Sequence, residues 1–154
     1  MGVGKTSVGL RLAKTLDVPF VDLDEMIERM VGEPIAALFA RWGEAHFRNQ
    51  ESKALRRVFD GPPGVVSLGG GTLHHGDNQA YVQSQADLVC LSLPFEAIQQ
   101  RVGDTDTERP LWVQARQLYD ERLPLYQSAG TYIDISGMSV DDVVGRMVEE
   151  CQCG

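Results

Sequence analysis

The start of the chain carries residue types that bind phosphate groups. Gly4, Lys5 and Thr6 match the last three positions of the phosphate-binding loop pattern G-x-x-x-x-G-K-[ST]. In this pattern, glycines let backbone N–H groups turn toward phosphates, the lysine neutralises the outer phosphates, and the hydroxyl binds Mg²⁺. The first glycine of the pattern would precede Met1. Because Gly-Lys-Thr occurs by chance in many chains, the interpretation depends on the residues that follow.

Two acidic residues, Asp22 and Asp24, follow a short apolar stretch. In an extended chain, residues two apart lie on the same face, so both carboxylates are expected to face one site. Asp22 can reach Mg²⁺ directly or through water, together with the Thr6 hydroxyl. Asp24 can accept hydrogen bonds from substrate hydroxyls and take the proton of one of them. An alternative is that Asp24 only caps a helix beginning at Glu25.

Two arginines and a run of glycines are candidates for binding a small acid. Arg48 and Arg122 carry guanidinium groups, whose fork of N–H donors matches a carboxylate bidentately. The alternative for Arg48 is an ordinary surface ion pair with Glu44 or Glu51, about one helical turn away. The three glycines at 69–71 follow an apolar stretch and would let the backbone approach a ligand closely.

Composition and charge limit the possible partners. The 154 residues are 43% hydrophobic and 23% charged, which suits one soluble domain. The net charge of -8 argues against a nucleic-acid partner, and it requires local arginines to attract an anionic substrate. No apolar run reaches the ~20 residues that span a membrane, and no secretory signal is visible. Three cysteines without framework spacing suit a reducing cytoplasm, where we expect the protein to act.

The apolar pattern predicts alternating strands and helices. Strands are expected at 19–24, 65–68, 87–93 and 132–136, and helices at 5–16, 25–31, 34–42, 44–59, 78–85, 95–102, 111–129 and 140–150. This alternation predicts an α/β fold in which helices cover both faces of a parallel sheet. Ligands in such folds bind at the carboxyl ends of the strands, where the acids and glycines fall.

Six local features stand in a fixed order along the chain. They are G-x-G-K-T, Asp22-x-Asp24, Phe47-Arg48-x-x-Glu51, Gly69-Gly70-Gly71, Glu108-Arg109-Pro110-Leu111 and Glu121-Arg122-Leu123-Pro124-Leu125-Tyr126. Together they resemble the shikimate kinases, enzymes of aromatic amino-acid biosynthesis, over essentially the whole chain. The resemblance implies a P-loop kinase-like parallel sheet flanked by helices, in a single domain over 1–154 with a lid at about 103–113.

The resemblance also implies the reaction and the residues that carry it. The reaction would be transfer of a phosphoryl group from ATP to the 3-hydroxyl of shikimate, with Mg²⁺, by a monomer. Catalytic roles would fall to Lys5, Asp24 and Arg109. Binding of ATP would fall to Gly2, Val3, Gly4, Lys5, Thr6, Ser7, Arg101 and Arg109. Binding of shikimate would fall to Asp24, Arg48, Gly70, Gly71 and Arg122, and binding of the metal to Thr6 and Asp22.

The chain departs from this family at its start, where the first and central strand of the sheet is missing. We therefore expect Met1 to be an internal methionine, and the chain as written to fold poorly and to bind ATP weakly. Two alternatives to the main interpretation stay open. One is a catalytically impaired relative that still binds a ligand, and the other is a different small-molecule kinase, such as a gluconate kinase.

Overall fold

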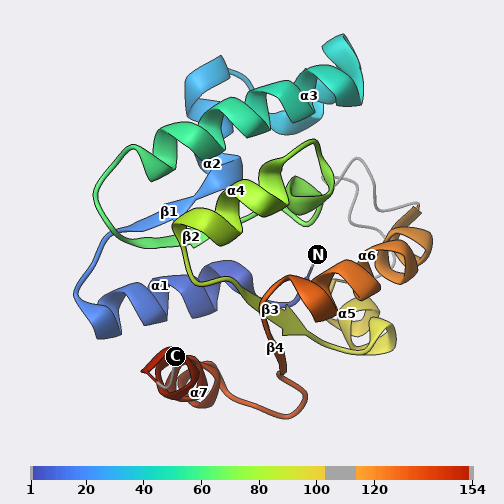
Figure 1. Ribbon diagram of the computed structural model, residues 1–154. Coiled ribbons are helices and arrows are strands. Elements are labelled where there is room, and N and C mark those ends of the chain that lie inside the picture. The colour runs from blue at the N-terminus through green and yellow to red at the C-terminus, as the bar shows by residue number, and fades with distance from the viewer. Residues whose placement is uncertain (1, 103–113, 153–154) are drawn as a thin grey trace.

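The computed structural model describes residues 2–102 and 114–152 (Figure 1). The expected lid at 103–113, and Arg109 with it, lies outside the described residues. The helices are α1 (Lys5–Leu16), α2 (Leu23–Val31), α3 (Ile35–Phe59), the 3-10 turn η1 (Thr72–His74), α4 (Asn78–Gln85), α5 (Phe95–Val102), α6 (Ala115–Ala129) and α7 (Val140–Gln152). The strands are β1 (Phe20–Asp22), β2 (Val65–Ser67), β3 (Val89–Ser92) and β4 (Thr131–Asp134). None of the described helices has the length and apolar character of a membrane span.

The described strands run parallel, as the alternation of elements predicted. They pair two by two, β1 with β2 and β3 with β4, and not as one continuous sheet. In the first pair, Asp22 lies opposite Ser67, so these two strands end level with each other. The residues that follow β1 and β2 therefore emerge at the same edge, which is where parallel α/β folds bind ligands.

Two groups of buried side chains form the core. The first joins α1, α5, β4 and α7 and includes Val3, Val8, Leu12, Ile98, Ile133, Val143, Val144 and Met147. The second joins α2, α3 and α4 and includes Leu23, Ile27, Leu38, Phe47, Ala54, Leu55, Leu73 and Val82. Figure 1 shows the same division, with α2, α3 and α4 on one side of the strands and α1 and α7 on the other.

The junction between β1 and α2 corrects one expectation from the sequence. The strand ends at Asp22, and Asp24 lies in the first turn of α2 instead of in an extended chain. The carboxylate of Asp22 causes this, because its Oδ1 accepts hydrogen bonds from the backbone N–H of Asp24 at 3.0 Å and of Glu25 at 3.4 Å. Asp22 is thus the helix cap, a position that favours aspartate.

The long helix α3 is two helices that meet at Gly43. Gly43 has φ 77° and ψ 174°, outside the helical region, so the chain turns between Trp42 and Glu44. The sequence predicted this break, since glycine adopts positive φ without steric cost. The second half of α3 carries Arg48 and Glu51.

Candidate active site

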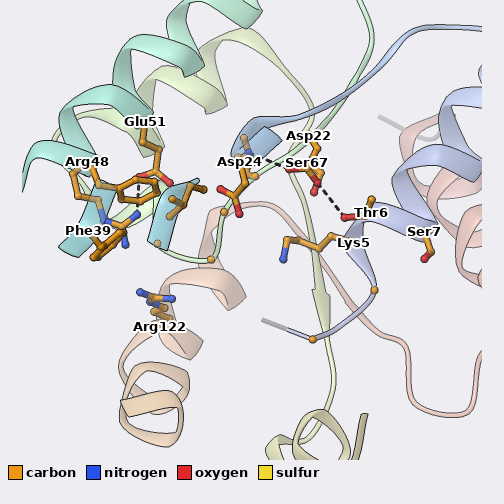
Figure 2. A pocket seen from close by; sticks show the side chains of 18 of the residues that line it. Lys5, Thr6, Ser7, Asp22, Asp24, Phe39, Arg48, Glu51, Ser67 and Arg122 are labelled. Carbon is orange, nitrogen blue, oxygen red and sulfur yellow. Dashed lines mark hydrogen bonds and ion pairs between the residues drawn. The ribbon is translucent and has the colours of Figure 1, made fainter. Parts of the chain in front are cut away.

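A cleft of about 610 Å³ brings most of the predicted site residues together (Figure 2). Those that line it are Gly2, Gly4, Lys5, Thr6, Ser7, Asp22, Asp24, Arg48, Gly70, Gly71, Arg101 and Arg122. Val3 is different, because its side chain is 7% exposed and belongs to the hydrophobic core beneath the loop. Figure 2 shows Lys5 and Asp24 pointing into the cleft, with Arg48 and Arg122 on its other side.

One side of the cleft is the N-terminus of α1. Gly4 precedes the helix with φ 88°, a left-handed conformation that suits glycine, and Lys5, Thr6 and Ser7 form the first turn. This turn holds no acidic residue. The unpaired N–H groups and the dipole of a helix start attract anions, and a lysine beside them adds a full positive charge. This side of the cleft therefore suits phosphate groups.

Two side chains with oxygen atoms that can bind a metal, Thr6 and Asp22, meet next to this helix start. The Thr6 hydroxyl donates a hydrogen bond to Asp22 Oδ2 at 3.1 Å, while Asp22 Oδ1 is occupied in capping α2. A hydroxyl and a carboxylate beside a phosphate site fit Mg²⁺, which prefers oxygen ligands and keeps several water or phosphate ligands of its own. Within the described residues there is no cluster of three or more His, Cys, Asp or Glu side chains suited to a metal. A magnesium ion that also binds phosphate oxygens does not need such a cluster.

Asp24 lies where several charged groups meet. Although solvent reaches it from the open cleft, the surrounding protein desolvates its carboxylate, and the negative charges of Asp22 and Glu51 add to this effect. Together they raise the pKa of Asp24 from 3.8 to about 6, against the opposing charges of Lys5 and Arg48. A carboxylate with this pKa is ionised at neutral pH and accepts a proton more readily than an ordinary aspartate.

Arg48 forms the opposite side of the cleft, and its partners are on its own helix. Its Nη1 donates to Glu51 Oε2 at 2.7 Å, and its Nη2 lies 3.3 Å from Glu44 Oε1. Both ion pairs that the sequence offered as an alternative are present, but Arg48 is only 8% exposed and Glu51 is fully buried. Arg48 is therefore a buried group that faces the cleft. Its shorter pair, with Glu51, is buried, whereas its longer contact with Glu44 lies at the surface.

Arg122 approaches the same region from α6 and is 9% exposed. The positive charges of Arg122 and Arg48 also act on His74, which does not line the cleft. Partial desolvation and the positive charges of these two arginines lower the pKa of His74, which lies just past the glycine run. The two arginines thus place positive charges next to the glycine run on a protein whose net charge is -8, where an anionic substrate needs them.

The glycine run passes close to these side chains. A Cβ at Gly71 would lie 2.7 Å from Arg48 Cζ, so any larger residue there would displace the guanidinium group from its present position. A Cβ at Gly69 would lie 3.0 Å from Glu51 Oε1 and 3.1 Å from Asp24 Oδ1. The Tyr126 hydroxyl, on α6, donates a hydrogen bond to the Gly70 carbonyl. The turn is therefore fixed between α3 and α6.

Several residues around the cleft were not assigned from the sequence. Glu51 was named only as part of a motif and as an ion-pair partner, although its position three residues after Arg48 signals the contact. Phe39 and Ile35 line the cleft from the first half of α3. Thr72, fully buried, donates to Glu51 Oε1 at 2.6 Å, and no sequence pattern pointed to it.

A parallel α/β fold, a phosphate-binding helix start and a facing arginine pair together define a P-loop kinase for small molecules. The family model of shikimate kinase matches residues 1–152. The shikimate kinase of Thermodesulfovibrio yellowstonii is 33% identical over 156 residues, covering 97% of this chain and 90% of that protein. The shikimate kinase of Salinibacter ruber is 37% identical, with 97% and 79% covered. The chain belongs to the shikimate kinase family.

Solved structures agree with this assignment. The shikimate kinase of Bacteroides thetaiotaomicron has a TM-score of 0.90 at 28% identity, with 99% of this chain and 94% of that chain covered. The shikimate kinase of Acinetobacter baumannii in complex with shikimate also has a TM-score of 0.90, at 30% identity, with 99% and 89% covered. The P-loop kinase-like fold expected from the sequence is thereby confirmed.

Proposed function

We propose that this chain transfers the γ-phosphoryl group of ATP to the 3-hydroxyl of shikimate in the cleft of Figure 2. One observation carries the proposal: a phosphate-binding helix start and a buried arginine pair line the same cleft as Asp24. The first suits a triphosphate, and the second suits the carboxylate of a small acid. Asp24 is then available to the hydroxyl that reacts.

The proposed reaction is an in-line displacement at the γ-phosphorus. The 3-oxygen of shikimate forms a bond to phosphorus while the bond from phosphorus to the oxygen shared with the β-phosphate breaks, and ADP leaves. Asp24 accepts the hydrogen bond of the attacking hydroxyl and then its proton. Lys5 neutralises charge on the phosphates, and Arg48 and Arg122 hold the carboxylate so that the hydroxyl is aligned.

The remaining predicted residues take supporting roles in the proposal. The backbone of Gly2, Val3 and Gly4 surrounds the phosphates, and that of Gly70 and Gly71 lies against shikimate. Arg101, which lines the cleft from the last turn of α5, is assigned to the nucleotide side. The role of Arg109 in a lid over the phosphates stays a prediction. Mg²⁺, held by Thr6 and Asp22, would neutralise phosphate charge when bound.

The proposal includes a cytoplasmic monomer that acts on small molecules without a nucleic-acid or membrane partner. ATP is available in the cytoplasm, and the negative net charge of -8 disfavours binding to nucleic acids or to anionic lipid surfaces. Light scattering coupled to gel filtration tests the monomer. A mass near 17.0 kDa is expected, and twice that mass would contradict it.

The function is tested by incubating the chain with Mg²⁺ and ATP and either shikimate, gluconate or no acceptor. ADP release is followed by a coupled assay, and the phosphorylated acid is identified by ³¹P NMR. We expect phosphorylated shikimate only with shikimate present. Equal ADP release without an acceptor, or faster transfer to gluconate, would overturn the proposal. Binding of shikimate without transfer would identify a catalytically impaired relative.

A further inference from the structure

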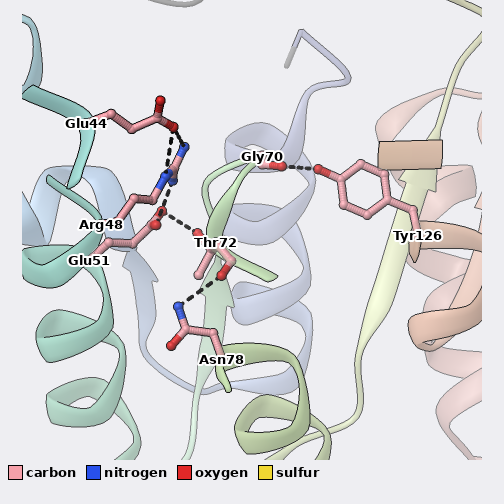
Figure 3. A network of polar contacts seen from close by, with 7 residues as sticks. All are labelled: Glu44, Arg48, Glu51, Gly70, Thr72, Asn78 and Tyr126. Atoms are coloured by element: carbon pink, nitrogen blue, oxygen red, sulfur yellow. Dashed lines mark hydrogen bonds and ion pairs between the residues drawn. The ribbon is translucent and has the colours of Figure 1, made fainter. Parts of the chain in front are cut away.

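A chain of buried polar contacts lies behind the arginine that faces the cleft (Figure 3). Arg48 Nη1 donates to Glu51 Oε2 at 2.7 Å, and the Thr72 hydroxyl donates to the other carboxylate oxygen, Oε1, at 2.6 Å. Asn78 Nδ2 donates to the Thr72 carbonyl at 2.9 Å. The three residues behind Arg48 are almost fully buried, Glu51 and Thr72 at 0% exposure and Asn78 at 1%.

The contacts place Thr72 in a particular role. A guanidinium group tends to bind a carboxylate through two parallel N–H donors, one to each oxygen. Here Glu51 receives Arg48 on one oxygen only, because the Thr72 hydroxyl is the donor on the other. The Thr72 hydroxyl therefore leaves part of the Arg48 fork directed away from Glu51. Glu44, more than half exposed, binds the Nε and Nη2 edge at 3.3 to 3.4 Å, which is long for a charged pair.

Thr72 also fixes the glycine run against the same helix. Its backbone N–H donates to the Gly69 carbonyl at 3.2 Å, closing the turn, and its hydroxyl ties that turn to α3 through Glu51. Asn78, the first residue of α4, holds the Thr72 carbonyl from behind. One threonine thus links the glycine backbone and the arginine side chain that face each other at Gly71.

We propose that Thr72 is a positioning residue for substrate binding, acting through Glu51 to orient Arg48 toward the substrate carboxylate. The proposal rests on the proposed function, since it takes the substrate to be a carboxylic acid held by Arg48. Without the hydroxyl, Glu51 Oε1 turns to the second N–H group of Arg48, because a buried carboxylate oxygen without a donor is costly. The guanidinium group then closes on Glu51 and is lost to the substrate.

The test compares Thr72→Val, which keeps the shape and removes the hydroxyl, with Thr72→Ser, which keeps the hydroxyl. Thr15→Val on the exposed face of α1 is the matched control. For each variant, KM for shikimate and for ATP, the Kd for shikimate by calorimetry, and the Tm are measured. We expect Thr72→Val to raise the KM and Kd for shikimate about tenfold and to leave KM for ATP within about twofold. Thr72→Ser should restore wild-type values, and Thr15→Val should match wild type.

The outcomes separate the inference from the function. Wild-type chain that binds shikimate without phosphorylating it would overturn the proposed function and leave the inference to be decided by Kd, and wild-type chain that does not bind shikimate would overturn both. If wild type is active and Thr72→Val keeps its affinity for shikimate, the positioning role alone is refuted. A lower Tm with both KM values unchanged, or a loss that Thr72→Ser does not repair, would likewise assign Thr72 to stability only. If Thr72→Val does not fold, Thr72→Ala removes the same hydroxyl and decides the question by the same measurements.

Discussion

The pKa of Asp24 is set by its surroundings, first by desolvation of its carboxylate and then by the charges around it. It shares the cleft with Asp22 and Glu51, whose negative charges disfavour ionisation, and with Lys5 and Arg48, whose positive charges favour it. The result is a pKa of about 6, raised by desolvation first and by the two acids next. A base works best when its pKa lies close to the working pH, so this arrangement suits removal of a hydroxyl proton.

The raised pKa of Asp24 predicts how activity depends on pH. Because only the ionised form accepts a proton, kcat/KM for shikimate should fall as the pH drops through about 6, tenfold for each further pH unit. Asp24→Asn should remove most of the activity at pH 7.5 and abolish this acidic limb from what remains. Initial rates between pH 5 and pH 8 in saturating Mg²⁺ and ATP check this, with Asp17→Asn at the exposed end of α1 as the control. If activity falls at low pH in Asp24→Asn as it does in wild type, a group other than Asp24 causes the fall.

The same shift predicts an effect on stability. The folded state keeps its Asp24 proton up to about pH 6, whereas the unfolded chain releases it near pH 3.8. The contribution of Asp24 to the free energy of unfolding is therefore largest below pH 3.8, decreases as the pH rises to about 6, and is constant above that. The Tm of ligand-free Asp24→Asn should exceed that of wild type at pH 7.5, and the difference should shrink toward pH 4. A difference independent of pH would contradict this.

Lys5 and Lys14 stand at opposite ends of α1 and allow a clean comparison. Lys5 is in the first turn beside the phosphate side of the cleft, whereas Lys14 is exposed in the last turn. We predict that Lys5→Met lowers kcat about 100-fold or more, since charge placed on the reacting phosphates is worth this much in related sites. Lys14→Met should stay within about twofold of wild type. Steady-state rates, with circular dichroism to confirm the fold, decide the matter.

At the scale of elements, the glycine run at 69–71 is constrained by the side chains that pack against it. A side chain at Gly71 would occupy the position of the Arg48 guanidinium group. We predict that Gly71→Ala weakens shikimate binding about tenfold or more and leaves ATP binding nearly unchanged. Gly145→Ala is the control, because a Cβ there meets nothing within 4 Å and alanine favours the interior of α7. Calorimetric titration with each ligand checks both variants, and equal losses for shikimate and ATP would refute the local explanation.

The elements differ in how far the sequence predicts them. The helix α1 has the bounds expected from its apolar spacing, because Val8 and Leu12 repeat at helical intervals and Gly4 ends the loop before it. The junction after β1 was predicted wrongly, since an extended chain through Asp24 was assumed. Asp22 uses its side chain to start α2 at Leu23, and such a local hydrogen bond overrides a pattern read from spacing alone.

The placement of Lys5 and Arg48 in one cleft agrees with the expectation from residue type, while their roles stay predictions. The burial of Arg48 was not predictable, because acids three residues after it and four before it are equally common on exposed helices. Thr72 gave no signal at all, since its partner Glu51 is 21 residues away and on another element. Contacts of this kind depend on how α3 packs against the glycine run, and the spacing of residues along the chain does not predict that packing.

At the scale of the whole molecule, the cleft joins the two halves of the core. The phosphate side depends on α1, whose Val8 and Leu12 belong to the first core group. The arginine side depends on α3, whose Leu38 and Phe47 belong to the second. The helix α6, which carries Arg122, packs against both groups. A ligand held by Arg48 and Arg122 would therefore tie α3 to α6.

This arrangement predicts that shikimate stabilises the protein without ATP. A ligand at 100 times its Kd stabilises the folded state by about 2.7 kcal/mol, which for a chain of this length raises Tm by about 5–10 °C. Thermal unfolding with increasing shikimate measures the shift, and gluconate at equal concentration should produce little, because its open chain does not match the preformed cleft. Arg122→Met should lose most of the shift, whereas Arg56→Met, at an exposed ion pair with Asp77, should keep it. A full shift in Arg122→Met would show that Arg122 does not take part in binding shikimate.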